Sequence, residues 1–310
     1  MSAYIYLLLG LGVLIFSGEL LVRGSVQIAR RFKISTLVVG LTIVAYGTST
    51  PEIFISIQAV LGGSFDIALG NVIGSNIANI GCILAIVLIV CPITIRNRGI
   101  GFDLAVMFSA TILLFVFGFN GVIGRFEGIF LLIFLISYTL WAVYKSKQKG
   151  GPKETEKATM KPLLASLMVF ASLVGMYFGA DWFVHGAKEV ATKWGVSERV
   201  IAISVVAIGT STPELITSLI AAFKKEADLA IGNIIGSNLF NIAGVLGITA
   251  IVRPLTVSNH TLFISDMMWL FGITIALILT MIPLSKGKIT RWEGGLLLLV
   301  FAVYMVILFR

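Results

Sequence analysis

Charge is what this 310-residue sequence has least of. Only 12% of its residues are Asp, Glu, Lys or Arg, whereas about a quarter of the residues in a soluble domain are charged. Hydrophobic residues make up 58%, and apolar stretches of about 20 residues, long enough to cross a bilayer, recur between the charges. The low charge excludes a water-soluble globular protein, and the non-alternating apolar runs exclude a transmembrane β-barrel. We expect an all-α polytopic membrane protein.

Cysteine and histidine are also scarce, with two of each. Cys82 and Cys91 lie in one apolar run, roughly 13 Å apart along a helix, so we expect them to pack as small apolar residues without a mutual disulfide. His185 and His260 lie near the ends of apolar stretches without metal-ligand spacing, which favours an interfacial or packing role. The net charge of +8 is typical of the basic loops that orient membrane proteins, so we expect no nucleic-acid partner.

The apolar runs predict ten transmembrane helices. A short charged linker, 145–161, divides them into a first five-helix unit, residues 1–144, and a second, residues 162–310. Asp66 and Asp228 begin two of the helices and are expected to act as N-caps. The approximate spans are 3–29, 36–61, 66–91, 101–119, 124–144, 162–192, 198–223, 228–252, 260–283 and 289–309.

The two halves of the chain repeat each other. The segment 45–52, Ala-Tyr-Gly-Thr-Ser-Thr-Pro-Glu, recurs as 207–214, and the segment 66–79 recurs as 228–241, with the same offset along the chain in both cases. When the two segments are extended to residues 57 and 81, 18 of 29 aligned positions are identical. Because each unit has an odd number of helices, the second copy must cross the membrane in the opposite direction. The sequence therefore predicts an inverted repeat.

The distribution of basic residues predicts the orientation in the membrane. If the N-terminus is outside, the cytoplasmic connections carry 16 Lys and Arg residues and the outer connections carry 6. The positive-inside rule therefore places both termini outside a cell membrane.

A weaker similarity between the two halves relates Gly124-Arg-Phe-Glu-Gly128 to Thr290-Arg-Trp-Glu-Gly294.

Polar residues gather in the second, third, seventh and eighth predicted spans. A carboxylate at mid-membrane costs about 2.5–3.5 kcal/mol on insertion scales, so Glu52 and Glu214 in symmetric positions indicate a function. Any single Ser, Thr or Asn could serve only to let helices pack or hydrogen-bond. The full set is Thr48, Ser49, Glu52, Asn71, Ser75, Asn76 and Asn79, mirrored by Thr210, Ser211, Glu214, Asn233, Ser237, Asn238 and Asn241.

We expect the second, third, seventh and eighth helices to be broken, and Pro51 and Pro213 predict where the second and seventh helices open. Each proline lacks an N–H and clashes with the carbonyl four residues earlier, so the helices are expected to open at 45–49 and 207–211. Carbonyls freed inside a membrane need partners, and cations supply them. With carboxylate, hydroxyl and amide oxygens they form an all-oxygen cage, which suits hard cations such as Ca²⁺.

The two glutamates also predict a mechanism. Two carboxylates in one low-dielectric site need counter-charge, so they hold one divalent ion, monovalent ions or protons. An empty, doubly charged centre is costly to occlude. We therefore expect the ion site to switch its access from one face of the membrane to the other only when ions are bound, as in an exchanger.

The paired Gly-Thr-Ser-Thr-Pro-Glu and Gly-Asn-x-x-Gly-Ser-Asn stretches resemble the two α-repeats of the sodium/calcium exchangers, in the cation/calcium exchanger superfamily. Over all ten helices the chain resembles a compact prokaryotic member. The resemblance implies a secondary active antiporter, not an enzyme and without a cofactor, that exchanges sodium for calcium by alternating access around a midplane site. Helices 1 and 6 would slide past the core. The implied partners are calcium and sodium ions and the lipid bilayer, and we expect a monomer.

The resemblance also implies the metal ligands. Glu52 and Glu214 would be shared by both ions, and Thr48 and Thr210 would help to form the calcium site. The other implied ligands are the Ala45 carbonyl, Ser49 and Ser75 for one sodium site, the Ala207 carbonyl, Ser211 and Ser237 for its mirror, and Asn79 and Asn241 beside the middle site.

Three alternatives stay open. Proton/calcium antiporters of this fold typically have Glu after Gly-Asn, whereas Asn71 and Asn233 are followed by Val and Ile. Potassium-dependent sodium/calcium exchangers have Asp where this chain has Asn241. An intramembrane hydrolase built on Ser49 or Ser211 belongs to another class, and it would need a base or a metal.

Overall fold

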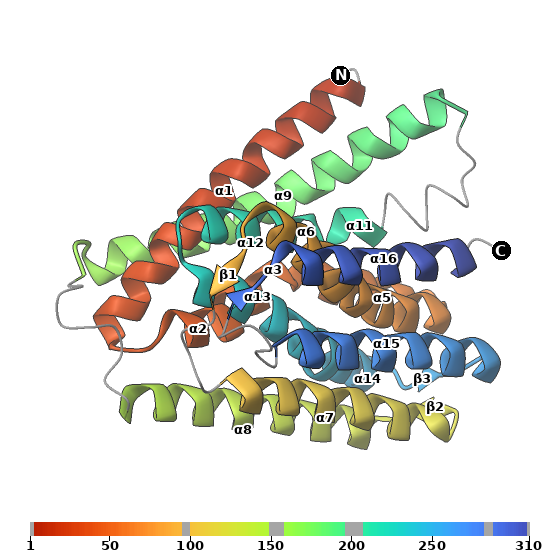
Figure 1. The fold of residues 1–310 in the computed structure, drawn as a ribbon. Coiled ribbons are helices and arrows are strands. Elements are labelled where there is room, and N and C mark those ends of the chain that lie inside the picture. Colours follow the sequence, from red (N-terminus) through yellow and green to blue (C-terminus); the bar gives the residue numbers. More distant parts are fainter. Residues whose placement is uncertain (1–2, 95–99, 149–157, 196–206, 282–287, 309–310) are drawn as a thin grey trace.

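The structure of the protein is a computed structural model that describes residues 3–94, 100–148, 158–195, 207–281 and 288–308. Helices make up almost all of the described chain, as the apolar runs predict (Figure 1). In the first half they are α1 (Ala3–Phe32), α2 (Thr36–Val39), the π-helical η1 (Gly40–Val44), α3 (Ala45–Thr48), α4 (Thr50–Leu61), α5 (Phe65–Ala78), the π-helical η2 (Asn79–Leu84), α6 (Ala85–Val90), α7 (Ile100–Phe119) and α8 (Arg125–Gln148). In the second half they are α9 (Pro162–Lys193), α11 (Ala207–Thr210), α12 (Thr212–Phe223), α13 (Ala227–Phe240), the π-helical η4 (Asn241–Val245), α14 (Leu246–Val252), α15 (His260–Met281) and α16 (Arg291–Leu308).

The membrane spans follow the predicted ones as far as the described residues reach. Eight described helices are long and apolar enough to cross a membrane, and the pair Thr36–Thr48 and Thr50–Leu61, bent by 44°, makes a ninth. The seventh predicted span, 198–223, is represented by α11 and α12, and its residues 198–206 lie outside the described part of the chain. The predicted linker is described only at its ends, because residues 149–157 also lie outside.

Several expected boundaries are wrong. The helix of the fifth span does not end at residue 144 but continues to Gln148. Within this extension, Lys145 places its ammonium group 4.3 Å from the centroid of the Trp141 ring, so its stem can pack along the helix. Asp66 and Asp228 are not N-caps. They lie in the first turns of α5 and α13, where a carboxylate still interacts favourably with the helix dipole.

The third and eighth spans are continuous rather than broken. Each runs unbroken over 26 residues, Phe65–Val90 and Ala227–Val252, and contains a π-helical segment that begins at Asn79 or Asn241. Neither span contains a proline, so every residue keeps its backbone donor and the chain widens locally without opening. Only the second and seventh helices carry the predicted break.

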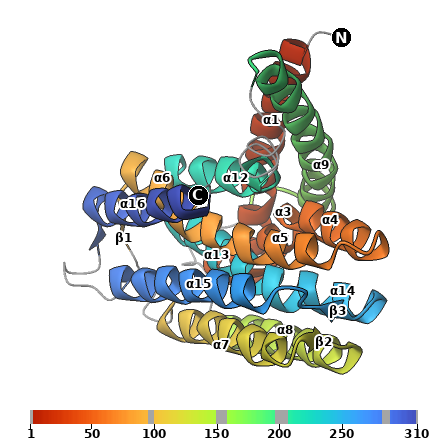
Figure 2. The same ribbon diagram turned by 90° about the vertical axis from the view of Figure 1, so that its right-hand side faces the viewer.

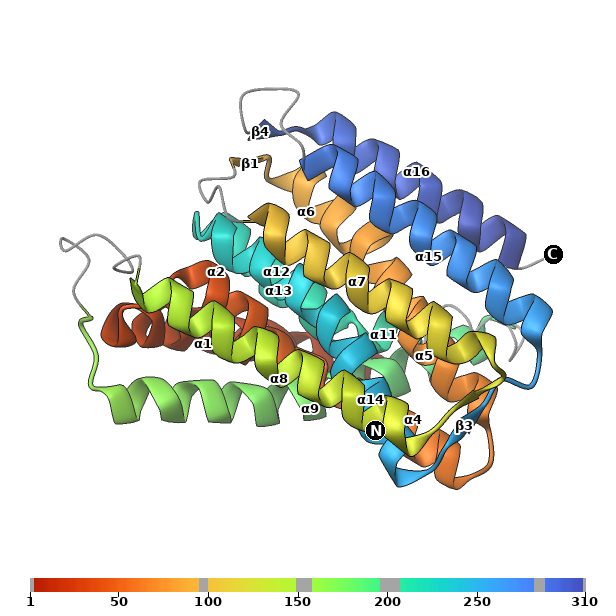
Figure 3. The same cartoon turned by 90° about the horizontal axis from the view of Figure 1, so that it is seen from below.

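Two short antiparallel strand pairs relate the two halves of the chain. β1 (Ile93–Thr94) pairs with β4 (Lys288–Ile289), and β2 (Val122–Ile123) pairs with β3 (Leu255–Thr256). The repeat offset that maps Glu52 onto Glu214 also maps β1 onto β3, and the slightly longer offset that maps Arg125 onto Arg291 maps β2 onto β4. Exchanging the halves thus converts one pair into the other. The pairs lie at opposite ends of the molecule, as an inverted repeat requires (Figure 3).

Helices α1 and α9 form a layer that crosses the other helices at a steep angle (Figure 2). They touch backbone to backbone: a Cβ added at Gly10 would lie 2.4 Å from the Phe183 nitrogen, and one at Gly186 would lie 2.4 Å from the Leu7 nitrogen. Any larger residue at these positions would push the helices apart. This contact explains why both long helices contain glycine.

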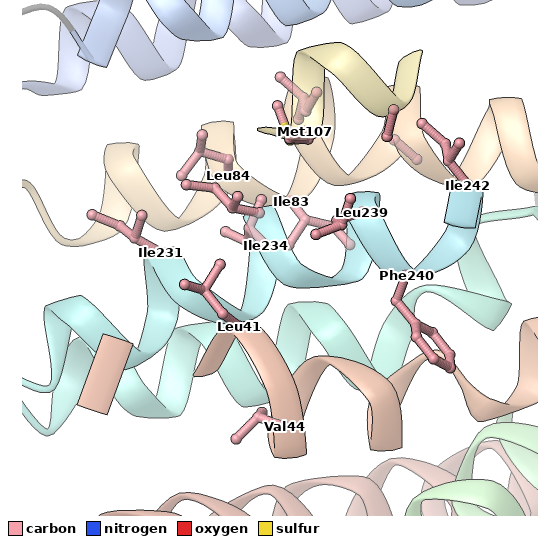
Figure 4. Packing of buried hydrophobic residues seen from close by; sticks show 14 of the residues in the cluster. Leu41, Val44, Ile83, Leu84, Met107, Ile231, Ile234, Leu239, Phe240 and Ile242 are labelled. Carbon is pink, nitrogen blue, oxygen red and sulfur yellow. The ribbon is translucent and has the colours of Figure 1, made fainter. Parts of the chain in front are cut away.

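The core surrounds the third and eighth spans. The best apolar windows of Ala227–Val252 and Phe65–Val90 are 89% and 78% buried, whereas that of Arg291–Leu308 is only 22% buried. Figure 4 shows α13 between η1, which contributes Leu41, and η2, which contributes Ile83. The two spans that carry the Asn and Ser motifs are therefore the ones enclosed by protein rather than by lipid.

Candidate functional site

The two predicted breaks position the site. Helix α3 ends and α4 begins at Ser49, with φ −87° and ψ 12°, and α11 and α12 meet in the same way at Ser211, with φ −88° and ψ 8°. Pro51 and Pro213 lie in the first turns after these joints. The proline prediction is therefore confirmed at both places.

The opening in the second helix is shorter than predicted. The Ala45 carbonyl is not free, because it accepts hydrogen bonds from the Ser49 N–H at 3.0 Å and from Thr48 Oγ1 at 3.3 Å. The helix therefore departs from regular geometry at one residue rather than over 45–49. The Ala207 carbonyl, its mirror, lies at the start of α11.

Glu52 and Glu214 lie in the first turns of α4 and α12 and are completely buried. Glu214 Oε1 accepts a hydrogen bond from Ser49 Oγ at 2.8 Å. Glu214 Oε2 and both carboxylate oxygens of Glu52 have no hydrogen-bond donor among the described residues. The two carboxylates are close enough to interact electrostatically. Burying such a pair costs several kcal/mol per charge, and a bound cation offsets that cost.

The first helix break meets the second repeat. Thr48 Oγ1 lies 3.3 Å from Asn233 Oδ1 and 3.5 Å from Ser237 Oγ, and Ser49 bonds Glu214. Helix α3 thus packs against α13, which is visible in Figure 1. In the mirrored position α11 packs against α5, which carries Ser75. Thr210, Ser211 and Ser75 are all buried, and Ser211 Oγ has no partner within the described chain.

Asn79 and Asn241 begin the π-helical segments η2 and η4 and are buried. Neither the oxygen nor the nitrogen of either side-chain amide has a partner among the described residues. A buried amide without partners costs about 1–3 kcal/mol per polar atom. Water would satisfy both the nitrogens and the oxygens of these amides, whereas a cation would satisfy the oxygens alone.

Sequence reasoning missed two residues beside the glutamates, Ser56 and Ser218. Each is buried one turn after its glutamate and accepts a hydrogen bond from Asn71 or Asn233. The signal was present, because both serines occupy the same position of the repeat. A serine inside an apolar helix is a common packing residue, and this interpretation hid its role.

The donor set fits hard cations. The described residues contain no group of three or more His, Cys, Asp or Glu side chains, so the site consists of two carboxylates with hydroxyl and amide oxygens around them. The hydrolase alternative gains no histidine base among the described residues: Ser49 bonds Glu214, Ser211 Oγ has no partner there, and His185 contacts Glu189 at 3.1 Å. Buried carboxylates at helix breaks in a helical membrane protein define a cation transporter.

The comparisons with known proteins give the family. The family model of the sodium/calcium exchanger protein matches residues 2–144 and 164–310. The chain is 37% identical to the putative antiporter CaxA of Alkalimonas amylolytica, over 99% of this chain and 98% of that one. It is 30% identical to the sodium/calcium exchanger MaX1 of Methanosarcina acetivorans, over 99% and 98%. A solved structure of the sodium-calcium exchanger NCX_Mj matches with 33% identity and a TM-score of 0.84, covering 99% of both chains. The protein belongs to the sodium/calcium exchanger family.

Proposed function

We propose that the protein exchanges sodium for calcium across the membrane by alternating access, with the ions bound between the two repeats. The observation that carries this proposal is the pair of fully buried glutamates, three of whose four carboxylate oxygens have no donor among the described residues. Two carboxylates balance one Ca²⁺, or bind Na⁺ together with neutral oxygens. The two ions therefore compete for the same charges, which is the condition for exchange.

The contacts favour a different grouping of the neutral ligands from the one that the resemblance implies. Thr48 lies beside Ser237, so the Ala45 carbonyl and Ser49 belong with Ser237 of the other repeat. By the symmetry of the halves, the Ala207 carbonyl and Ser211 then belong with Ser75. Glu52, Glu214, Thr48 and Thr210 remain the proposed calcium ligands, with Asn79 and Asn241 beside them.

The proposed topology has residues 1–144 and 162–310 as inverted five-helix units joined by the cytoplasmic segment 145–161. The N- and C-termini lie toward the end of the molecule that carries β2 and β3 (Figure 1), which supports an even number of spans. We propose that this end is extracellular in a cell membrane and that the monomer works without a cofactor. Single cysteines at Val122 and Pro92, which are exposed beside the two strand pairs, are introduced into a chain without Cys82 and Cys91 and labelled from outside in intact cells. Only the cysteine at position 122 should react.

Transport into proteoliposomes tests the exchange. Vesicles loaded with sodium and diluted into sodium-free buffer should take up radiolabelled calcium, and a pH or potassium gradient of the same size should not drive uptake. The variants Glu52→Gln and Glu214→Gln, purified as folded protein, should show no sodium-driven calcium uptake. Uptake driven by protons, or only when potassium is present, would replace the proposal with one of the two alternatives of the same fold.

A further inference from the structure

Two asparagines tie the glutamate-bearing helices to their neighbours in the same way in both repeats. Asn71 Nδ2, on α5, donates to the Glu52 carbonyl at 3.3 Å and to Ser56 Oγ at 2.9 Å. Asn233 Nδ2, on α13, donates to the Glu214 carbonyl at 3.4 Å and to Ser218 Oγ at 3.0 Å. The asparagine, glutamate and serine positions all obey the same repeat offset. The chain thus builds one local geometry twice.

Each of these asparagine contacts lies beside a helix break, where backbone hydrogen bonds alone do not fix the orientation of the half-helix. Pro51 lacks an N–H, so α4 is not joined to α3 by a regular hydrogen-bond ladder across Ser49. The rotation of α4 about its axis decides where the Glu52 carboxylate points. The Asn71 amide holds two acceptors one turn apart on a single face of α4, and two such contacts fix both the rotation and the height of the helix against α5.

In the second repeat the asparagine also contacts a residue of the first repeat. Thr48 Oγ1 of α3 lies 3.3 Å from Asn233 Oδ1, so the nitrogen of this amide holds α12 while its oxygen orients a hydroxyl of the opposite repeat. Asn233, Ser218 and Thr48 are all fully buried. No water competes for these groups, so each hydrogen bond restricts geometry more strongly than one at a surface.

We propose that Asn71 and Asn233 are positioning residues for ion binding, acting through the half-helices that carry Glu52 and Glu214. They do not bind the ion. They hold the two carboxylates at the separation that one divalent ion bridges. This inference rests on the proposed exchange and adds to it the residues that set the affinity of the site.

Replacing Asn71 or Asn233 with leucine, which has similar volume and no hydrogen-bond donor, tests the proposal. Calcium binding to purified protein in detergent is measured by calorimetry, and calcium uptake is measured in proteoliposomes. Loss of two buried hydrogen bonds should raise the calcium concentration for half-maximal binding roughly tenfold in Asn71→Leu. The increase should be larger in Asn233→Leu, which also loses the Thr48 contact. Thr111→Val is the matched control, because Thr111 is buried and bonds only its own helix, at Met107.

A second variant separates positioning from folding. Ser56→Ala removes one of the two acceptors of Asn71 and should raise the calcium midpoint less than Asn71→Leu does. The double variant should behave like Asn71→Leu alone, because the serine acts only through the asparagine. If the asparagine variants melt earlier without ions but keep the calcium midpoint of the unmodified chain, their role is structural and the proposal is overturned. If the unmodified chain binds no calcium, the exchange proposal itself has failed.

Discussion

Removing the hydroxyl of Ser49 should destabilise the ion-free protein, whereas removing that of its mirror Ser211 should not. Ser49 Oγ donates to Glu214 Oε1 at 2.8 Å, and both residues are completely buried. A hydrogen bond to a charged group contributes about 1.5–3 kcal/mol. In Ser49→Ala the carboxylate loses its side-chain donor inside the membrane, so we expect a loss of about that size. Ser211 Oγ has no partner in the described chain, so Ser211→Ala should change the stability by close to zero.

The measurement is the apparent melting temperature in detergent, with choline in place of sodium and a chelator to remove calcium. One kcal/mol shifts the melting temperature by about 2–4 °C in domains of 150–250 residues. Ser49→Ala should therefore melt several degrees earlier, while Ser211→Ala should stay within about a degree of the unmodified protein. A double-mutant cycle with Glu214→Gln assigns the difference to the pair. Equal shifts in the two alanine variants would refute the reasoning, because they would show that the two breaks are equivalent.

Three further variants test other parts of the structure. Gly10→Ala should destabilise the protein by about 1–3 kcal/mol through its backbone clash in the α1–α9 contact, whereas Gly12→Ala, with nothing within 4 Å of its Cβ, should be neutral or stabilising in the same thermal assay. Asn241→Asp adds the third carboxylate of potassium-dependent relatives, and calcium uptake should become sensitive to potassium; an unchanged response would show that this position does not set selectivity. Lys224→Met removes the ion pair with Glu19 at 2.5 Å, and because both side chains are 31% exposed the loss should be at most about 1 kcal/mol and should shrink with added salt.

The repeat and the prolines made much of the fold predictable. An unchanged offset across two motifs implies two copies of one unit, and five helices per unit imply inversion. Proline acts through its own ring and its missing N–H, so Pro51 and Pro213 predicted their breaks without any knowledge of the surroundings. The cost of a carboxylate inside an apolar span can likewise be judged from the neighbouring residues, and Glu52 and Glu214 were identified for that reason.

The π-helical segments at Asn79 and Asn241 were not predictable from residue type. No proline or charge marks them, and a π-helix differs from an α-helix only in which carbonyl each N–H finds. That choice depends on how the third and eighth spans pack against the rest of the core. The predicted end of the fifth helix and the predicted N-cap roles of Asp66 and Asp228 were wrong for a related reason. Helix ends depend on side-chain contacts as well as on propensity.

Sequence alone identified the residue types of the site and their spacing along each helix, because the cost of a buried carboxylate and the geometry of a proline are properties of a few neighbouring residues. The pairing of Thr48 and Ser49 with Ser237, Asn233 and Glu214 needed the folded molecule. These partners are separated by 165–189 residues, and hydrogen bonds over such distances exist only once the two repeats have packed. The sequence therefore supplies two similar half-sites, and the packing of α3 against α13 makes them one.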